Sequence, residues 1–520
     1  MNLSPLQEHA PQNTDMRIQE DLYGHRFAQD QEPFMIVLET LAVYSAVPYP
    51  NPNDAPQSSY SLQHRRKMRF LLFQDPYLER IITDNQIPDP QKWTEWKTKI
   101  NQQFLAQENN LTRDDENDAF AYLDEKFSSN IETLYQAVHI LRSHELDSSH
   151  NRRWTSRFLA VQGSSTICAD MSKNWSPDRR FFGRGGELVY LMLNKFSDRK
   201  AREELNQKIH QRFLNQKSPI NKIAEALSES DSADGKSDIK IGCLPEHSFN
   251  AYKHMAEDWL NLLTCDDLPD EHLFDPLFRI TGLNLVVYFA EVAQKIRQEP
   301  PIPLIVDLTE GNNQHLCQEA ENCLLQHREA ANKAIDTFVK HKLTEPDYHQ
   351  KWQEALKRKD LLSAQNILKQ AFALKENENF HKNLPIEELL SNVIKRAQER
   401  SDNNIYKYLL PLTKGSGLVT ARQKVKPRFT LNNDVLLALV LTNVKYTIPL
   451  KEFIENLYKR YQIVIGPEEA RKAFGQRIRT ECYEENLEAL EKRLTLLSLA
   501  QRLSDDCAFV INPYKTKTAQ

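Results

Sequence analysis

Glycine is the residue that most constrains the fold of this chain. Only 13 of its 520 residues are glycine. Phosphate-cradling loops, dinucleotide fingerprints and stacks of tight hairpins need glycine at fixed positions, because glycine adopts left-handed backbone conformations without strain. A chain of this length corresponds to about three to four domains of ordinary size. The scarcity of glycine therefore predicts a mostly α, multi-domain protein.

Charge and cysteine content narrow the class of protein further. The 67 basic and 72 acidic residues give a net charge of −5, so no global charge draws the chain to nucleic acid or membrane. Seven cysteines form no CxxC pair, and the polar start lacks the apolar stretch of a signal peptide. The longest apolar runs, Val435–Leu441 and Leu285–Ala290, are far shorter than the roughly 20 residues that span a bilayer. We expect a soluble, cytoplasmic protein with reduced thiols.

Composition divides most of the chain into four consecutive segments. A polar stretch with few large apolar groups predicts a disordered lead-in over residues 1–32. Helical spacing of apolar residues predicts an acidic helical domain over residues 33–150 and a second helical domain over residues 239–412. Between them lies a basic segment with helices, residues 151–230. The Ser/Asp/Gly tract Ser228–Asp238 predicts a flexible boundary after it.

The clearest fold signal lies in the last segment, residues 429–514, which follows an expected linker at Gly415–Arg428. Apolar periodicity predicts four helices in it. The apolar runs Leu499–Leu503 and Ala508–Ile511, with a turn between them, predict a β-hairpin. Helices closed by a two-stranded hairpin predict a winged-helix-like domain. The predicted helices are Asp434–Asn443, Pro449–Tyr461, Pro467–Arg479 and Glu484–Leu497.

The last helix of a winged helix often enters the major groove of DNA. Here that helix carries four glutamates and two basic residues, so its exposed face repels phosphate. Basic residues on the neighbouring helices leave contact with the DNA backbone open. The sequence favours protein docking or plain packing over DNA readout. The glutamates are Glu484, Glu485, Glu488 and Glu491.

An Arg-rich and aromatic-rich stretch is the best candidate for a nucleic-acid surface. Residues 151–220 carry fourteen basic and six acidic residues, a local net charge of +8. Arg binds phosphate bidentately, aromatic rings stack on bases, and free N–H groups at a helix start bind anions. Equally open is that these arginines pair with carboxylates at a domain interface. The candidate residues are Arg152, Arg153, Trp154, Arg157, Arg179, Arg180, Arg184, Gly185 and Gly186.

Four residues within one stretch resemble zinc ligands. Finger-type sites pair ligands across a turn, whereas these residues lie inside one continuous helical pattern. Only Cys323 and His327 share a face of that helix, so core or solvated roles are favoured and no metal is expected. The four residues are His315, Cys317, Cys323 and His327.

No catalytic motif emerges from the sequence. A Walker loop, GxSxG, HExxH, a deaminase pair and a paired-carboxylate nuclease core are all absent. The closest approach to a metal-binding carboxylate pair is Asp307 with Glu310, but no Glu-x-Lys partner follows at short spacing. We therefore favour a non-catalytic protein without a cofactor. A metal-dependent nuclease with unrecognised ligands stays open as an alternative.

Several blocks of sequence carry a family resemblance: Arg153–Phe158, Arg179–Leu193, Glu485-Asn486, Leu490–Leu494, Leu503–Asp505 and Val510–Pro513. They are similar to large helical proteins encoded beside helicases and ATPases in bacterial anti-phage islands, of the Druantia type or the phosphorothioation-dependent restriction type. The resemblance implies a non-catalytic subunit of a multi-gene antiviral defence system. It also implies partners encoded in the same locus, such as helicase or ATPase subunits, and contact with DNA or RNA. A winged-helix transcriptional regulator is a further alternative.

Overall fold

A computed structural model gives the fold of most of the chain. Helices account for nearly all regular structure in the residues that it describes, which confirms the mostly α prediction. The described residues are 14–24, 33–47, 59–107, 118–146, 153–171, 184–195, 198–229, 239–242, 244, 249–375, 380, 384–420, 426–475, 478–504 and 507–515.

The chain forms two compact units, each assembled from separate stretches of sequence. Composition marks continuous segments, whereas contacts in the folded state join stretches that are far apart in the chain. The units therefore do not follow the segment boundaries expected above. Unit 1 comprises Met1–Val37, Gly183–Lys208 and Gly242–Gln520, and unit 2 comprises Leu38–Phe182 and Ile209–Ile241. Helices α2 (Pro33–Ala46) and α9 (Arg199–Arg212) each contain a boundary between these ranges.

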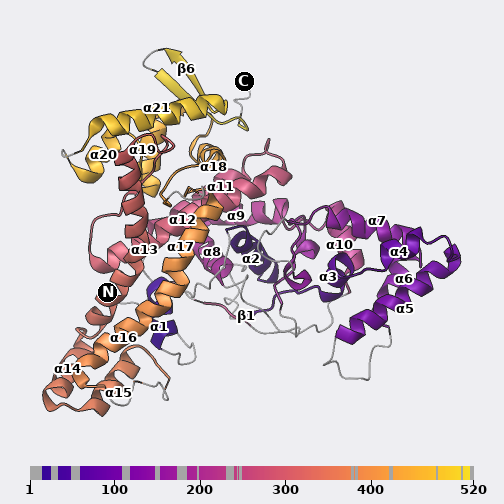
Figure 1. Ribbon diagram of the computed structural model, residues 1–520, viewed down its shortest axis with the longest axis horizontal. Helices are drawn as coiled ribbons and strands as arrows, with labels where there is room; N and C mark the ends of the chain where they lie inside the picture. Colours follow the sequence, from indigo (N-terminus) through magenta and orange to yellow (C-terminus); the bar gives the residue numbers. More distant parts are fainter. Residues whose placement is uncertain are drawn as a thin grey trace. The chain divides into compact units, whose positions relative to one another are not determined.

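Unit 2 is a helical domain with an aromatic core, and its helices between residues 66 and 142 are drawn in violet in Figure 1. Its longest helix, α5, places Trp93, Trp96, Ile100 and Phe104 on one buried face, at the three- and four-residue spacing of a helix. The Phe104 ring packs edge-on against Phe70, with ring centroids 4.9 Å apart. The elements of unit 2 are β1 (Ser59–Tyr60), α3 (Arg66–Phe73), α4 (Leu78–Thr83), α5 (Asp89–Gln107), α6 (Tyr122–Phe127), α7 (Ile131–Arg142), the 3-10 turns η1 (Trp154–Ser156) and η2 (Ser164–Thr166), α10 (Pro219–Leu227) and β2 (Ile239–Lys240), which pairs antiparallel with β1.

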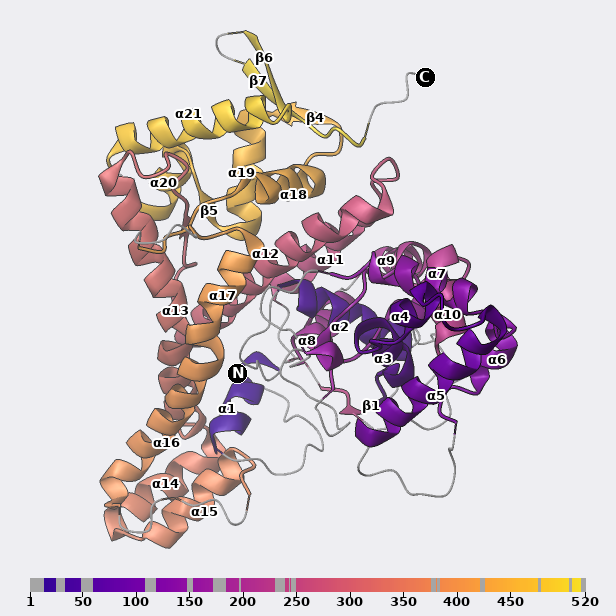
Figure 2. The ribbon, with the colours of Figure 1, turned by 45° about the vertical axis from the view of Figure 1, so that its right-hand side comes forward.

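Unit 1 contains the longer helices of the chain. In Figure 2, α13 runs from the C-terminal elements at one end to α14 and α15 at the other. Its elements up to residue 416 are α1 (Thr14–Tyr23), α8 (Gly185–Asn194), α11 (Asn250–Leu263), α12 (Asp270–Arg297), β3 (Leu304–Ile305), α13 (Gln314–Lys342), α14 (Pro346–Arg358), α15 (Leu361–Ala371), α16 (Ile386–Ser401), the π-helical turn η3 (Asp402–Tyr406) and α17 (Lys407–Ser416).

Helix α12 is the core helix of unit 1. It packs against α11, α13 and α17. Among the described residues, its stretch His272–Arg297 is long and apolar enough to cross a membrane, but 72% of its most apolar part is buried inside the structure. Such burial is typical of the core helix of a soluble protein.

Helix α1 corrects one expectation from composition. Residues 14–23 belong to the stretch expected to be a disordered lead-in, yet they form a helix that packs against α12, α13 and α16. Ile18, Leu22 and Tyr23 are buried, and the backbone carbonyl of Tyr23 accepts a hydrogen bond of 2.8 Å from the Tyr288 hydroxyl. Three apolar side chains at helical spacing are enough to hold this helix in the fold because neighbouring helices cover them.

The C-terminal part of unit 1 combines helices with a small antiparallel sheet. The sheet has the strand order β4-β7-β6, and its β6–β7 hairpin confirms the predicted one. Helix α20 ends earlier than expected because Gly475 follows it with a φ of 76°. The elements are α18 (Asn433–Asn443), β4 (Thr447–Pro449), α19 (Leu450–Tyr461), β5 (Ile463–Val464), α20 (Pro467–Phe474), α21 (Thr480–Leu496), β6 (Ala500–Ser504) and β7 (Cys507–Ile511).

The expected linker before this part is not a free connection in the described residues. Val419, inside the expected linker, bridges antiparallel to Phe429, the residue that follows it. Strand β3 pairs in parallel with β5. Helix α18 packs against α11 and α12. Residues 429–514 are thus an integral part of unit 1.

A buried ion pair joins the two parts of unit 1 at this point. The Arg428 guanidinium Nε lies 2.7 Å from Oδ2 of Asp307, and the side chains are 7% and 0% exposed. The other oxygen of Asp307, Oδ1, accepts hydrogen bonds from the backbone N–H and the hydroxyl of Thr309. The backbone N–H of Asp307 donates to the carbonyl of Phe429 over 3.0 Å.

We predict that Asp307→Asn destabilises unit 1. The substitution leaves the buried Arg428 cation without a counter-charge, and breaking such a pair costs about 3–5 kcal/mol. Thermal unfolding should show a lower Tm. Asp336→Asn is the matched control, because its pair with Lys340 is exposed and such pairs contribute about 0.5 kcal/mol. Equal Tm values for the two variants would contradict the prediction.

Candidate functional site

The first candidate residues lie in a loop of unit 2 that contacts α3. Trp154, in η1, packs edge-on against Phe70 with ring centroids 5.4 Å apart. Arg153 places Nη2 3.5 Å from the hydroxyl oxygen of Ser156. The indole ring of Trp154 therefore contributes to the aromatic core of unit 2.

Arg157 is engaged with a carboxylate and a ring. Its Nε and Nη2 groups each donate to one carboxylate oxygen of Glu145, a bidentate pair. Its guanidinium lies 4.3 Å from the centroid of the Phe73 ring. The side chains of Arg157 and Glu145 stay 34% and 23% exposed, so this pair lies at the surface. Pairing with a carboxylate was the second of the two roles left open by the sequence.

Two further arginines hold the same loop, and the sequence analysis did not identify them. Arg69 is fully buried and donates to the backbone carbonyls of Ala169, at 2.5 Å, and of Arg157, at 3.1 Å. Burial lowers the pKa of its guanidinium. Arg65 donates to the carbonyls of Ile167 and Ser164. The basic run at the start of α3 was the signal that could have indicated them.

The second group of candidate residues opens helix α8 in unit 1. Arg184 precedes the helix with a φ of 73°, and Gly185 and Gly186 are buried in its first turn. The Arg184 guanidinium donates to both oxygens of Glu187, at 3.1 and 2.9 Å. Glu187 is completely buried and also accepts from the backbone N–H of Gly242. A carboxylate of the chain itself therefore pairs with Arg184 at this helix start.

Arg152, Arg179 and Arg180 lie outside the described residues. The described candidates fall in two places: Arg153, Trp154 and Arg157 in unit 2, and the start of α8 in unit 1. A joint nucleic-acid surface of all nine residues stays a prediction.

The residues that resemble zinc ligands make contacts typical of a core helix. Cys323 is buried, with its sulfur 3.0 Å from the Pro303 carbonyl oxygen, and Nε2 of His327 lies 3.1 Å from the same oxygen. Burial lowers the pKa of His327 to about 4. His315 pairs with Glu319 over 3.1 Å. Among the described residues, no three His, Cys, Asp or Glu side chains gather closely enough to hold a metal ion.

Asp307, the first residue of the possible carboxylate pair, is fully buried and saturated with protein donors. Cys317 places its sulfur 3.4 Å from Oδ2 as well. A metal ligand needs a free lone pair directed at an open position. The bonding of Asp307 therefore favours a structural role over a role as a metal ligand.

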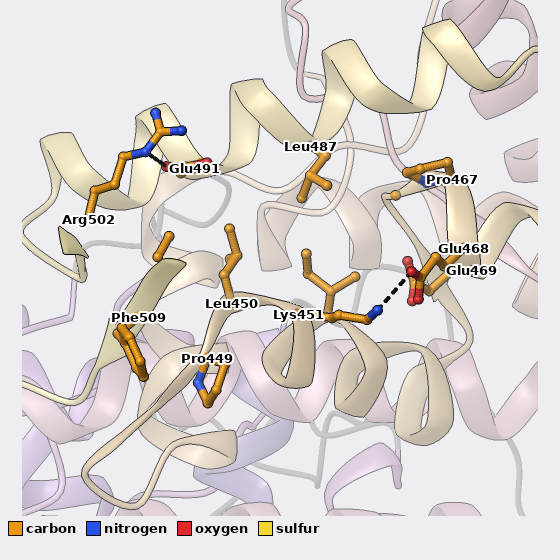
Figure 3. A pocket seen from close by; sticks show the side chains of 13 residues that line it. Pro449, Leu450, Lys451, Pro467, Glu468, Glu469, Leu487, Glu491, Arg502 and Phe509 are labelled. Atoms are coloured by element: carbon orange, nitrogen blue, oxygen red, sulfur yellow. Dashed lines mark hydrogen bonds and ion pairs between the residues drawn. The ribbon is translucent and has the colours of Figure 1, made fainter. Parts of the chain in front are cut away.

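A cavity of about 340 Å³ lies in the C-terminal part of unit 1, between α19, α20, α21 and the hairpin. Figure 3 shows Leu487 pointing from α21 toward Leu450 on α19, with Phe509 of β7 nearby. Two ion pairs stand at opposite ends of these apolar side chains. Lys451 Nζ lies 2.9 Å from Glu468, and Arg502 Nε lies 3.6 Å from Glu491. We call this cavity the C-terminal slot.

The face of α21 beside the slot is acidic. Glu481, Glu484, Glu485 and Glu488 are exposed. Glu485 accepts a hydrogen bond of 2.8 Å from the side-chain amide of Asn313. The opposite face of α21 is buried through Tyr483, Asn486, Leu490 and Leu494. Helix α21 therefore turns negative charge outward along its first three turns.

Comparisons with known proteins give no relative for this chain. No protein-family model matches it, and no curated protein or solved structure matches it.

We predict that Arg184→Ala lowers the Tm of the protein. Glu187 is fully buried, so the loss of its bidentate partner leaves a buried carboxylate with a weaker set of donors, at a cost of about 3 kcal/mol. Arg199→Ala is the control, because its pair with Glu203 is exposed. An unchanged Tm with weakened DNA or RNA binding would show instead that Arg184 contacts phosphate.

We also predict a pH dependence that arises from His327. Its pKa is about 4 in the folded state, below the ordinary histidine value of 6.5 that the unfolded chain has, so the unfolded chain binds more protons between these values. Stability is therefore lost as the pH falls from 6.5 to 4, by about 2 kcal/mol at pH 5. His327→Gln keeps a donor for Pro303 and should reduce the loss of stability between pH 7 and pH 5. An unchanged loss of stability between pH 7 and pH 5 in His327→Gln would contradict the prediction.

Proposed function

We propose that this chain is a non-catalytic subunit of a multi-gene bacterial anti-phage system and that it docks a protein partner through a winged-helix-like C-terminal domain. The observation that carries the docking role is the outward-facing acidic surface of α21. The resemblance of the sequence blocks to anti-phage proteins motivates the biological setting. The proposal places the protein in the cytoplasm, without a cofactor.

The order and pairing of the C-terminal elements support the winged-helix interpretation. Helix α18 leads into strand β4, helices α19 to α21 follow, and the hairpin β6–β7 closes the segment. Strand β4 pairs with β7, which places the first strand beside the hairpin. In winged helices of this order the last helix before the hairpin is the one that contacts DNA. That helix is α21 here.

Charge argues that α21 docks protein and does not read DNA. Duplex DNA carries about one negative charge per 1.7 Å of its axis, so it repels a helix face that exposes Glu481, Glu484 and Glu488. The hairpin is the other element that contacts DNA phosphate in winged helices. Here it carries Arg502, and a carboxylate already lies beside this cation, since its Nε is 3.6 Å from Glu491. A partner with a basic surface gains from the same charges. Contact of the chain with nucleic acid then falls to the Arg-rich stretch of residues 151–220.

The two alternative functions have less support. A nuclease built on Asp307 needs a free carboxylate, and this one is already bonded to Arg428 and Thr309. A transcriptional regulator needs a recognition helix that tolerates phosphate nearby, and α21 is acidic. A subunit that works through partners agrees with the absence of a catalytic motif in the sequence.

A phage-challenge assay with the native gene cluster tests the proposal. Removal of the gene should weaken or abolish protection, and the protein expressed alone should confer none. The double variant Glu484→Lys and Glu488→Lys should also lose protection, while its non-specific DNA binding rises because four units of charge change in favour of phosphate. Protection by the protein alone would contradict the subunit role.

The control reverses two exposed glutamates outside both proposed contact surfaces, Glu388→Lys and Glu399→Lys on α16. This variant has the same net charge as the α21 variant and should keep full protection. Stronger DNA binding by the α21 variant together with unchanged protection would favour DNA contact at α21 over protein docking.

A further inference from the structure

We infer that the C-terminal slot binds a basic amphipathic segment of a partner protein, whose apolar side chain and an adjacent Lys or Arg enter the slot together. This inference rests on the proposed docking function and names the chemistry of the partner.

The volume and the apolar lining of the slot are suited to binding side chains of a partner. A cavity of about 340 Å³ is at the lower end of the range for ligand pockets, about 300–1,000 Å³. Leu450, Ile454, Leu487 and Phe509 give it an apolar lining. Helix-in-groove complexes use such a lining to bind apolar residues spaced three and four apart.

A buried carboxylate gives the slot its charge preference. Glu469 lines the slot and is only 4% exposed. Among the described residues, no Lys or Arg forms an ion pair with Glu469. The two cations that line the slot pair with other carboxylates, Lys451 with Glu468 and Arg502 with Glu491. Burial raises the pKa of the Glu469 carboxyl, and the positive charge of Lys472 offsets only part of this effect.

The carboxylate and the apolar floor are adjacent. A Cβ added at Gly466 would lie 3.0 Å from Oε2 of Glu469 and 3.7 Å from Cδ2 of Leu487. A Lys or Arg side chain can therefore lay its methylene groups on Leu487 while its charged end reaches Glu469. Glu484, on the same helix face as Leu487, adds negative charge outside the slot. The apolar lining with Leu487, the buried carboxylate of Glu469 and the exposed carboxylate of Glu484 all favour a segment that is both apolar and basic.

Fluorescence anisotropy with the full chain tests the inference. The probe is a short fluorescein-labelled helical peptide with Leu at positions i, i+3, i+4 and i+7 and Lys elsewhere. It should bind, whereas the same peptide with Glu in place of Lys, or Ser in place of Leu, should not. Leu487→Ala and Glu469→Gln should each weaken binding by about tenfold, the effect typical of a central interface residue.

Matched controls separate the slot from general attraction between a basic peptide and an acidic protein. Leu496→Ala truncates an exposed leucine of the same helix, and Glu452→Gln neutralises an exposed glutamate of α19. Both should bind the Lys peptide as the wild type does. Gly466→Ala is a further variant that tests the slot itself. The φ of Gly466 is one that alanine adopts, and the added methyl group intrudes beside Glu469 and Leu487. Thermal unfolding checks that each variant is folded.

Equal loss of binding in the control variants, or equal binding of the Glu peptide, would overturn the inference. Phage challenge distinguishes this failure from a failure of the proposed function. If Leu487→Ala protects fully while the α21 double variant Glu484→Lys and Glu488→Lys does not, the slot is refuted and docking through α21 stands. If the gene is dispensable for protection, the proposed function is refuted whatever the peptide does.

Discussion

The buried ion pair of Asp307 and Arg428 is the interaction on which the arrangement of unit 1 depends. A charge pair out of water is stable only when further hydrogen bonds satisfy its remaining atoms. Asp307 meets this condition because Thr309 donates to its second carboxylate oxygen. Its backbone is held as well, since its N–H donates to the carbonyl of Phe429 and its carbonyl accepts from the hydroxyl of Thr430. Two other buried polar side chains act in the same way. Asn486 bonds to Val306, Leu308 and Ile465, and Asp258 bonds to Arg460, Tyr461 and Asn284. Together they fix the C-terminal elements to the helices before them.

The elements that the sequence predicted well are those whose signal is local. Helices α18 and α19 follow from apolar spacing, and the β6–β7 hairpin follows from two short apolar runs with a turn between them. The failures concern partners that are distant in sequence. Strand β3 has too few residues to indicate a sheet, and its partner β5 lies about 160 residues later. Helix α1 is polar in composition and is covered by α16, which no local pattern could indicate.

The candidate site shows the same limit in chemical terms. Arg157 and Arg184 are planar cations with several donors, and that chemistry suits phosphate and carboxylate equally. Sequence spacing identified both residues but could not select the anion. In the folded chain Glu145 and Glu187 are the anions. The acidic face of α21 was predictable from four glutamates, because its helical register was clear. The slot beside it was not, since its lining comes from three helices and from all three strands of the small sheet.

The buried face of α21 bears on the docking that we propose for its exposed face. The buried face is fastened by Asn486 and by Tyr483, whose hydroxyl donates to Glu319 over 2.5 Å. Ordering a flexible element on binding costs about 0.5–1.5 kcal/mol for each immobilised side chain. A helix that is already fixed avoids most of this cost, so its acidic face and Leu487 are presented in one geometry. The polar contacts that attach α21 to the body of unit 1 therefore also fix the face that we propose for docking, and the glutamates Glu481, Glu484 and Glu488 on that face are exposed.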